Sequence, residues 1–111
     1  MTLSSTLPET RSRTVILDPA AVLAWHDRLG AIVNHGNRID RRHADAINDI
    51  RGRLCAIAAC VGPVTIAAWE PLSWATSLML TAQKIGAHEV ATVLHAVGND
   101  IAEAAGTAVA P

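Results

Sequence analysis

Two of the five histidines have a spacing that raises the question of a metal site. His88 and His95 lie seven residues apart, so a helix places them on one face, about 10.5 Å apart along its axis. A zinc ion needs ligands at roughly 2.0–2.1 Å, so this pair alone cannot hold one. His88-Glu89 also lacks the second histidine, four residues after His88, that the zinc-protease motif requires. The sequence therefore predicts no metal site and no cofactor.

Two other histidines interrupt apolar helical patterns. His26 lies at the edge of an apolar stripe, and His43 falls between Ile39 and Ile47. If their helices form a hairpin, the two imidazoles could meet in its core, where each needs a hydrogen-bond partner to offset burial. We interpret them as hydrogen-bonded core or boundary residues. A ligand-binding or pH-sensing pocket around His26 and His43 is the alternative.

The densest basic group consists of Arg38, Arg41 and Arg42, in the first turns of a predicted helix. The helix dipole favours acidic side chains there, so this placement could mark a surface for a phosphate, a nucleic acid or an acidic partner. Asp45 and Asp49 are interleaved at spacings of three and four, so ordinary ion pairs on a solvated face explain the pattern as well. We predict that the three arginines either contact a partner or form such surface pairs.

Residues 78–95 resemble a helix-turn-helix, with a small residue at Ala82, a glycine in the turn at Gly86 and an apolar second helix. The early residues of that second helix should then read the DNA major groove. They include no arginine or lysine, and residues 61–111 carry one basic and four acidic groups. Because phosphate neutralisation dominates DNA affinity, we do not expect nucleic-acid binding from this unit.

No pattern supports covalent catalysis. Ser73 and Ser77 lack the glycine-rich elbow of serine hydrolases, and the chain has no phosphate-cradling glycine loop. Cys55 and Cys60 lie five residues apart, about 140° around a helix, so they cannot form a disulfide within it. The sequence predicts a protein without enzymatic activity whose thiols stay reduced, as they do in the cytoplasm.

Composition and periodicity predict the elements that carry these residues. Half of the residues are hydrophobic and 17% are charged, with no Phe or Tyr, which favours closely packed helices. Apolar repeats at spacings of three, four and seven predict helices over 19–34, 38–61, 71–85 and 88–105. Thr14–Leu17 is a short β-prone run. The stretch 64–69 is either a short fifth helix or an extended connector.

These elements predict an all-α fold, a small single-domain bundle of four main helices. The helix over 38–61 should be central, because Gly52, Ala56 and Cys60 form a row of small residues that lets another helix approach closely. We place the domain at 15–106, with a flexible tail over 1–14 and a frayed end over 107–111. Prolines and glycines break the charge-poor region into pieces shorter than the roughly 20 apolar residues of a membrane span.

The low charge and the weakly polar helix faces favour a small cytoplasmic protein–protein interaction module, because exposed apolar surface usually marks a contact. We expect a regulatory or inhibitory protein of the bacterial or phage type that self-associates, docks on a larger complex, or both. Trp69, Trp74 and Leu78 should anchor a homo-oligomer interface, since tryptophans are frequent hot spots. The three arginines should bind the partner.

Two alternatives come from other functional classes. One is a nucleic-acid-associated regulator that uses the three arginines or the unit over 78–95. The other is a ligand-binding bundle or small enzyme built around His26 and His43. Neither alternative is supported by a specific sequence motif. A protein partner is therefore the first expectation, and a membrane is not expected.

Overall fold

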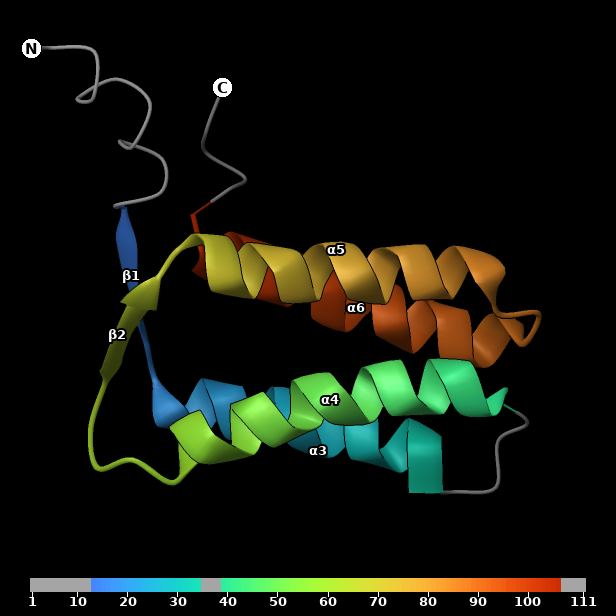
Figure 1. Cartoon of the computed structure of the whole chain (residues 1–111), viewed down its shortest axis with the longest axis horizontal. Helices are drawn as coiled ribbons and strands as arrows, with labels where there is room; N and C mark the ends of the chain where they lie inside the picture. The colour runs from blue at the N-terminus through green and yellow to red at the C-terminus, as the bar shows by residue number, and fades with distance from the viewer. Residues whose placement is uncertain (1–12, 35–38, 107–111) are drawn as a thin grey trace, which may run out of the picture.

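Four helices and a two-stranded ribbon make up the part of the chain that the structure describes, residues 13–34 and 39–106. In the computed structural model, the elements are β1 (Thr14–Leu17), α3 (Pro19–Asn34), α4 (Arg41–Ala58), β2 (Val64–Ala67), α5 (Trp69–Lys84) and α6 (His88–Ala104). The helices run alternately in opposite directions, with the ribbon across one end (Figure 1). The prediction of a small bundle of four main helices is confirmed.

The helix ends follow local sequence signals only in part, and α5 begins at Trp69, two residues before the predicted start. Pro19 begins α3 as predicted, and the Asp18 carbonyl accepts the first helical hydrogen bond from Val22, at 3.1 Å. The second helix begins at Arg41, not at 38, and its N-cap Asp40 makes no side-chain capping bond. It ends at Ala58, so the predicted continuation to 61 is wrong. Residues 35–38, which connect α3 to α4, lie outside the described residues.

The predicted apolar stripes form one core. Each helix contributes four residues at helical spacing, and strand β1 adds one at the end of the bundle. These residues are Leu17; Val22, Trp25, Leu29 and Ile32; Ile47, Ile50, Leu54 and Ile57; Trp74, Ala75, Leu78 and Ala82; and Val90, Leu94, Val97 and Ile101. The helix periodicity in the sequence therefore located most of the buried surface.

The ribbon joins two segments that lie fifty residues apart in the sequence. β1 and β2 are antiparallel, with Leu17 opposite Val64, and an additional bond runs from the Ala68 N–H to the Arg13 carbonyl at 2.9 Å. Leu17 is buried and Ile16 is 68% exposed, as alternation along a strand requires. The stretch 64–69 is thus a strand followed by the start of α5, so the fifth-helix alternative is wrong. The ribbon begins at Thr14, which moves the start of the folded domain before residue 15.

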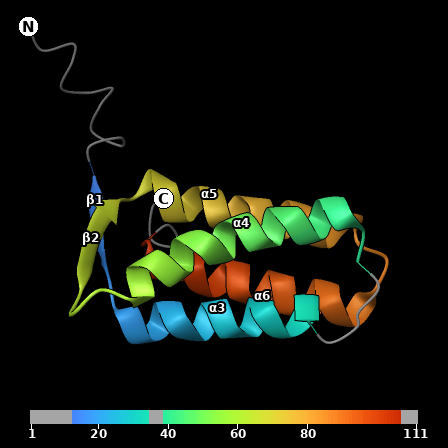
Figure 2. The same cartoon turned by 60° about the horizontal axis from the view of Figure 1, so that its bottom comes forward.

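The helices form two closely packed antiparallel pairs, α3 with α4 and α5 with α6. α3 also packs on α6, and among these neighbouring helices α4 and α5 are the most loosely packed pair (Figures 1 and 2). The second helix is therefore not central. Nothing within 4 Å would meet a Cβ atom at Gly52, and Ala56 and Cys60 are exposed. Small residues permit a close approach, but no described helix of this chain covers that face of α4.

The connection between α4 and α5 explains why these two helices stay apart. β2 runs from the layer of α3 and α4 to the layer of α5 and α6 at one end of the bundle (Figure 1). A four-residue strand spans about 13 Å, far more than a tight turn between neighbouring helices. Gly62, at φ +84°, supports the bend that leads from α4 into this strand.

Candidate functional site

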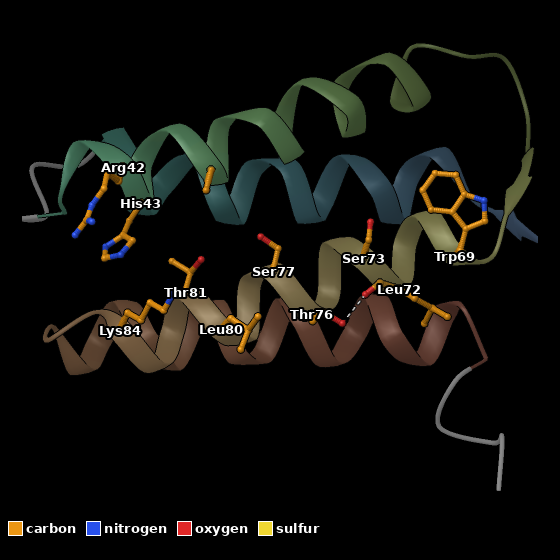
Figure 3. Close-up of a pocket in the computed structure, with 11 residues that line it drawn as sticks. Arg42, His43, Trp69, Leu72, Ser73, Thr76, Ser77, Leu80, Thr81 and Lys84 are labelled. Carbon is orange, nitrogen blue, oxygen red and sulfur yellow. Dashed lines mark hydrogen bonds between the residues drawn. The ribbon is translucent and has the colours of Figure 1, made fainter. Parts of the chain in front are cut away.

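A groove of about 760 Å³ runs between α4 and α5. α4 provides its residues near the N-terminal end of that helix, and α5 provides one face along its whole length (Figure 3). The groove, called the α4–α5 groove below, is lined by Arg42, His43, Ala46, Trp69, Leu72, Ser73, Thr76, Ser77, Leu80, Thr81 and Lys84. It lies between two neighbouring helices that pack more loosely than the other neighbouring pairs of the bundle.

Short hydroxyl side chains from α5 line much of the groove. Ser73 Oγ donates a hydrogen bond to the Glu70 carbonyl at 2.7 Å. Thr76 Oγ1 donates one to the Leu72 carbonyl at 2.9 Å (Figure 3). These two hydroxyls are satisfied by their own helix, which is a common arrangement for Ser and Thr within helices. Apolar groups of a ligand can therefore cover these two hydroxyls without leaving a hydrogen-bond donor unsatisfied.

Large apolar side chains lie exposed along the same helix. Trp69, at one end of the groove, is 58% exposed, and Leu80 is 49% exposed. Leu72 is half-buried beside them. Exposed apolar surface that rims a concavity is typical of a binding site rather than of a solvated helix face.

Basic side chains gather at the end of the groove away from Trp69. Arg42 and His43 reach from α4 toward Lys84 on α5 (Figure 3). Arg42 Nη2 lies 3.7 Å from Asp40 Oδ2, too far for a hydrogen bond, and both groups are strongly exposed. Within residues 39–106, no carboxylate forms a salt bridge with His43 or Lys84. This end is therefore able to attract an anionic group.

The Trp69 end of the groove carries a compensated ion pair. Arg53 on α4 donates to both carboxylate oxygens of Glu70 on α5, through Nε at 2.5 Å and Nη2 at 3.1 Å. The hydrogen bond to Glu70 raises the pKa of Arg53 above its ordinary value, while partial desolvation opposes the rise. The pair joins the two helices at this end and leaves little net charge there.

The structure corrects two of the three predicted interface residues. Trp74 and Leu78 are 6% and 1% exposed and belong to the core of the chain, so they cannot anchor a contact with another molecule. They lie four residues apart on the inner face of α5. Trp69 begins the helix on a different face and is exposed, so it alone of the three is available at the surface.

His26 and His43 do not form the pocket that their sequence context allowed. The His26 carbonyl accepts a bond from Arg51 Nε at 3.3 Å, and its ring Nδ1 lies 3.1 Å from the Asp27 carboxylate. His43 precedes Arg51 on α4 by eight residues, about 12 Å of helix, and faces the α4–α5 groove. The two histidines therefore lie at different levels of the bundle.

Only two of the three arginines that were predicted to bind a partner lie in the described part of the chain. Arg38 lies outside the described residues, Arg41 is exposed, and Arg42 lines the groove. His88 and His95 are exposed on α6. In the described segments, no group of three or more His, Cys, Asp or Glu side chains is arranged to hold a metal ion.

The unit over 78–95 is part of an antiparallel helical hairpin. α5 and α6 pack side by side along most of their length (Figures 1 and 2). A DNA-binding helix-turn-helix instead crosses its two helices at about 90–120° and leaves the second one free to enter a groove. The resemblance noted in the sequence thus reflects the small residues and the glycine of a helical hairpin.

Sequence reasoning missed the groove itself. The weakly polar face of α5, with Ser73, Ser77 and Lys84, was visible as a pattern, but its position opposite Arg42 and His43 was not.

None of the described helices is both long enough and apolar enough to cross a membrane. Comparison of the chain with family models, curated proteins and solved structures finds no match.

Proposed function

We propose that this protein is a small protein–protein interaction module, of regulatory or inhibitory type, that binds a helix of a partner protein in the α4–α5 groove. The observation that carries the proposal is the loose packing of α4 against α5 beside exposed Trp69 and Leu80. The two large side chains line an open groove over a packed core, so a partner can bury them without unfolding the bundle.

The shape of the groove favours a helix as the occupant. α5 offers sixteen residues, about 24 Å of helix, along one wall. Two roughly antiparallel helices with small side chains between them form a furrow into which the side-chain ridge of a third helix fits. An amphipathic helix in a hydrophobic groove is a recurrent mode of recognition, in which the anchors lie three or four residues apart.

The concave shape of the groove also favours a partner helix over self-association through the same face. A two-fold dimer uses one surface patch on both subunits, so two copies would meet groove against groove. Neither hollow would be filled, and Trp69 would remain partly hydrated. A convex helix from a different chain buries the same residues more completely.

A neutral helical probe tests the proposal. We would use a fluorescein-labelled 16-residue peptide with blocked ends, Leu at spacings of three and four, and Ala and Gln elsewhere. Fluorescence anisotropy should report saturable binding to the protein. Ser77→Phe places bulk inside the groove and should weaken binding at least tenfold. Thr92→Phe places the same bulk on the exposed face of α6 and should leave binding unchanged.

Far-UV circular dichroism of both variants controls for folding. Absence of saturable binding to the wild-type protein would contradict the proposal. Equal weakening by Ser77→Phe and Thr92→Phe in folded proteins would contradict it too, because it would place the peptide outside the groove.

A further inference from the structure

The two ends of the α4–α5 groove differ in charge, and this difference assigns the polarity of its occupant. We infer that the docked helix carries acidic side chains in its C-terminal turn and runs parallel to α5, with that turn beside Arg42, His43 and Lys84. The inference rests on the proposed function and specifies the chemistry and direction of the partner helix.

The basic end has unused capacity for an anion. Arg42 and His43 from α4 and Lys84 from α5 converge there from opposite walls (Figure 3). The only carboxylate that the described structure pairs with them is Asp40, at 3.7 Å from Arg42. A carboxylate bound between the two walls could therefore form charge-assisted bonds to more than one basic group.

The other end is already neutralised. Arg53 and Glu70 bind one another through two hydrogen bonds close to Trp69. An acidic side chain of the occupant would meet Glu70 there, and a basic one would meet Arg53. The charge pattern thus favours acidic residues at one end only and an apolar anchor at the Trp69 end.

The helix dipole selects the same direction. The C-terminus of a helix carries about half a negative charge, and its N-terminus carries about half a positive charge. With its C-terminal turn at the basic end, the occupant places its dipole and its acidic side chains beside the same cations. The reversed helix would place its positive end there. Because α5 runs from Trp69 to Lys84, the favoured occupant runs parallel to α5.

Two peptides of equal composition test this polarity. Both extend the neutral probe with three Glu residues, in the last turn of one peptide and in the first turn of the other. Acidic residues in the first turn stabilise a free helix, so helicity alone favours the second peptide. We expect the first peptide to bind about tenfold more tightly at 20 mM salt, and its advantage should shrink at 0.5 M.

Variants locate the cause of that preference. Arg42→Gln/Lys84→Gln changes two exposed residues and should abolish the preference for the first peptide. Arg41→Gln removes a neighbouring exposed charge outside the groove lining and should leave most of the difference intact. A nitroxide on the N-terminus of the first peptide should broaden the Trp69 indole NMR signal more than a nitroxide on its C-terminus.

The outcomes separate this inference from the proposed function. Equal affinities for the two acidic peptides, or a preference that survives Arg42→Gln/Lys84→Gln, would overturn the polarity while the neutral peptide still binds. Stronger broadening of Trp69 from the C-terminal nitroxide would overturn the direction. Failure of the neutral peptide to bind would overturn the proposed function itself.

Discussion

The uncovered face of α4 yields a prediction in which a glycine is replaced without crowding. Gly52 lies in the interior of α4, and a Cβ atom there meets nothing within 4 Å. Gly98 lies in the interior of α6 but is buried, and its Cβ atom would lie 3.2 Å from Met79 Cγ and 3.3 Å from the Ala75 carbonyl oxygen. The same substitution thus meets open space in one helix and packed atoms in the other.

The expected magnitude follows from helix propensity. Alanine is favoured over glycine inside a helix by about 1 kcal/mol, so Gly52→Ala should raise the free energy of unfolding by about that amount. For a domain of roughly 100 residues this corresponds to a rise in Tm of about 4–8 °C. Gly98→Ala gains the same propensity, but its contacts with α5 oppose the gain, so it should be less stable than Gly52→Ala.

Urea unfolding followed by far-UV circular dichroism measures both variants on one scale. The refuting result is a Gly52→Ala protein that is no more stable than Gly98→Ala, or that is less stable than the wild type. A Gly52→Ala protein less stable than the wild type would mean that something covers the small residues of α4 in solution. A second copy of the chain would then be the first candidate, and a change in sedimentation coefficient would reveal it.

Three further tests probe particular contacts by the same unfolding measurement. Leu94→Ala opens a cavity at a fully buried position and should cost about 2–5 kcal/mol, whereas Leu80→Ala, on the groove rim, should cost less than about 1 kcal/mol; similar losses would contradict the assigned burial. A double-mutant cycle on Arg53 and Glu70 should give a coupling below about 1 kcal/mol that falls with salt, because the Arg53 side chain is 44% exposed; a coupling above about 2 kcal/mol would contradict this. Gly62→Ala should cost about 1–2 kcal/mol, since φ is +84° there, and unchanged stability would show that the bend is not left-handed.

The helices were predictable because their information is local. Leu54 and Leu94 belong to long apolar series at helical spacing, and both are fully buried. The ribbon was not predictable with the same certainty, since its two strands have four residues each and pair across fifty residues of chain. A four-residue β-prone run such as Thr14–Leu17 carries no mark of its partner.

The groove was harder to predict because it forms where two helices, α4 and α5, pack only loosely against each other. The row through Gly52 and Ala56 signalled a close helix contact, but a small residue only permits such an approach and cannot supply the neighbour. Trp74 was expected at the surface as an anchor, yet its position on the inner face of α5 buries it. The position of Lys84 across the groove from Arg42 depends on the connection through β2, which no local pattern encodes.

The three tryptophans provide the most direct test of helix docking in the α4–α5 groove. Trp69 is 58% exposed at the end of the groove, whereas Trp25 and Trp74 are each 6% exposed in the core. Titration with the peptide that carries Glu in its last turn should shift the Trp69 indole N–H signal in an ¹⁵N–¹H spectrum and leave the other two nearly unchanged. Saturable binding that leaves the Trp69 signal in place would contradict docking in this groove.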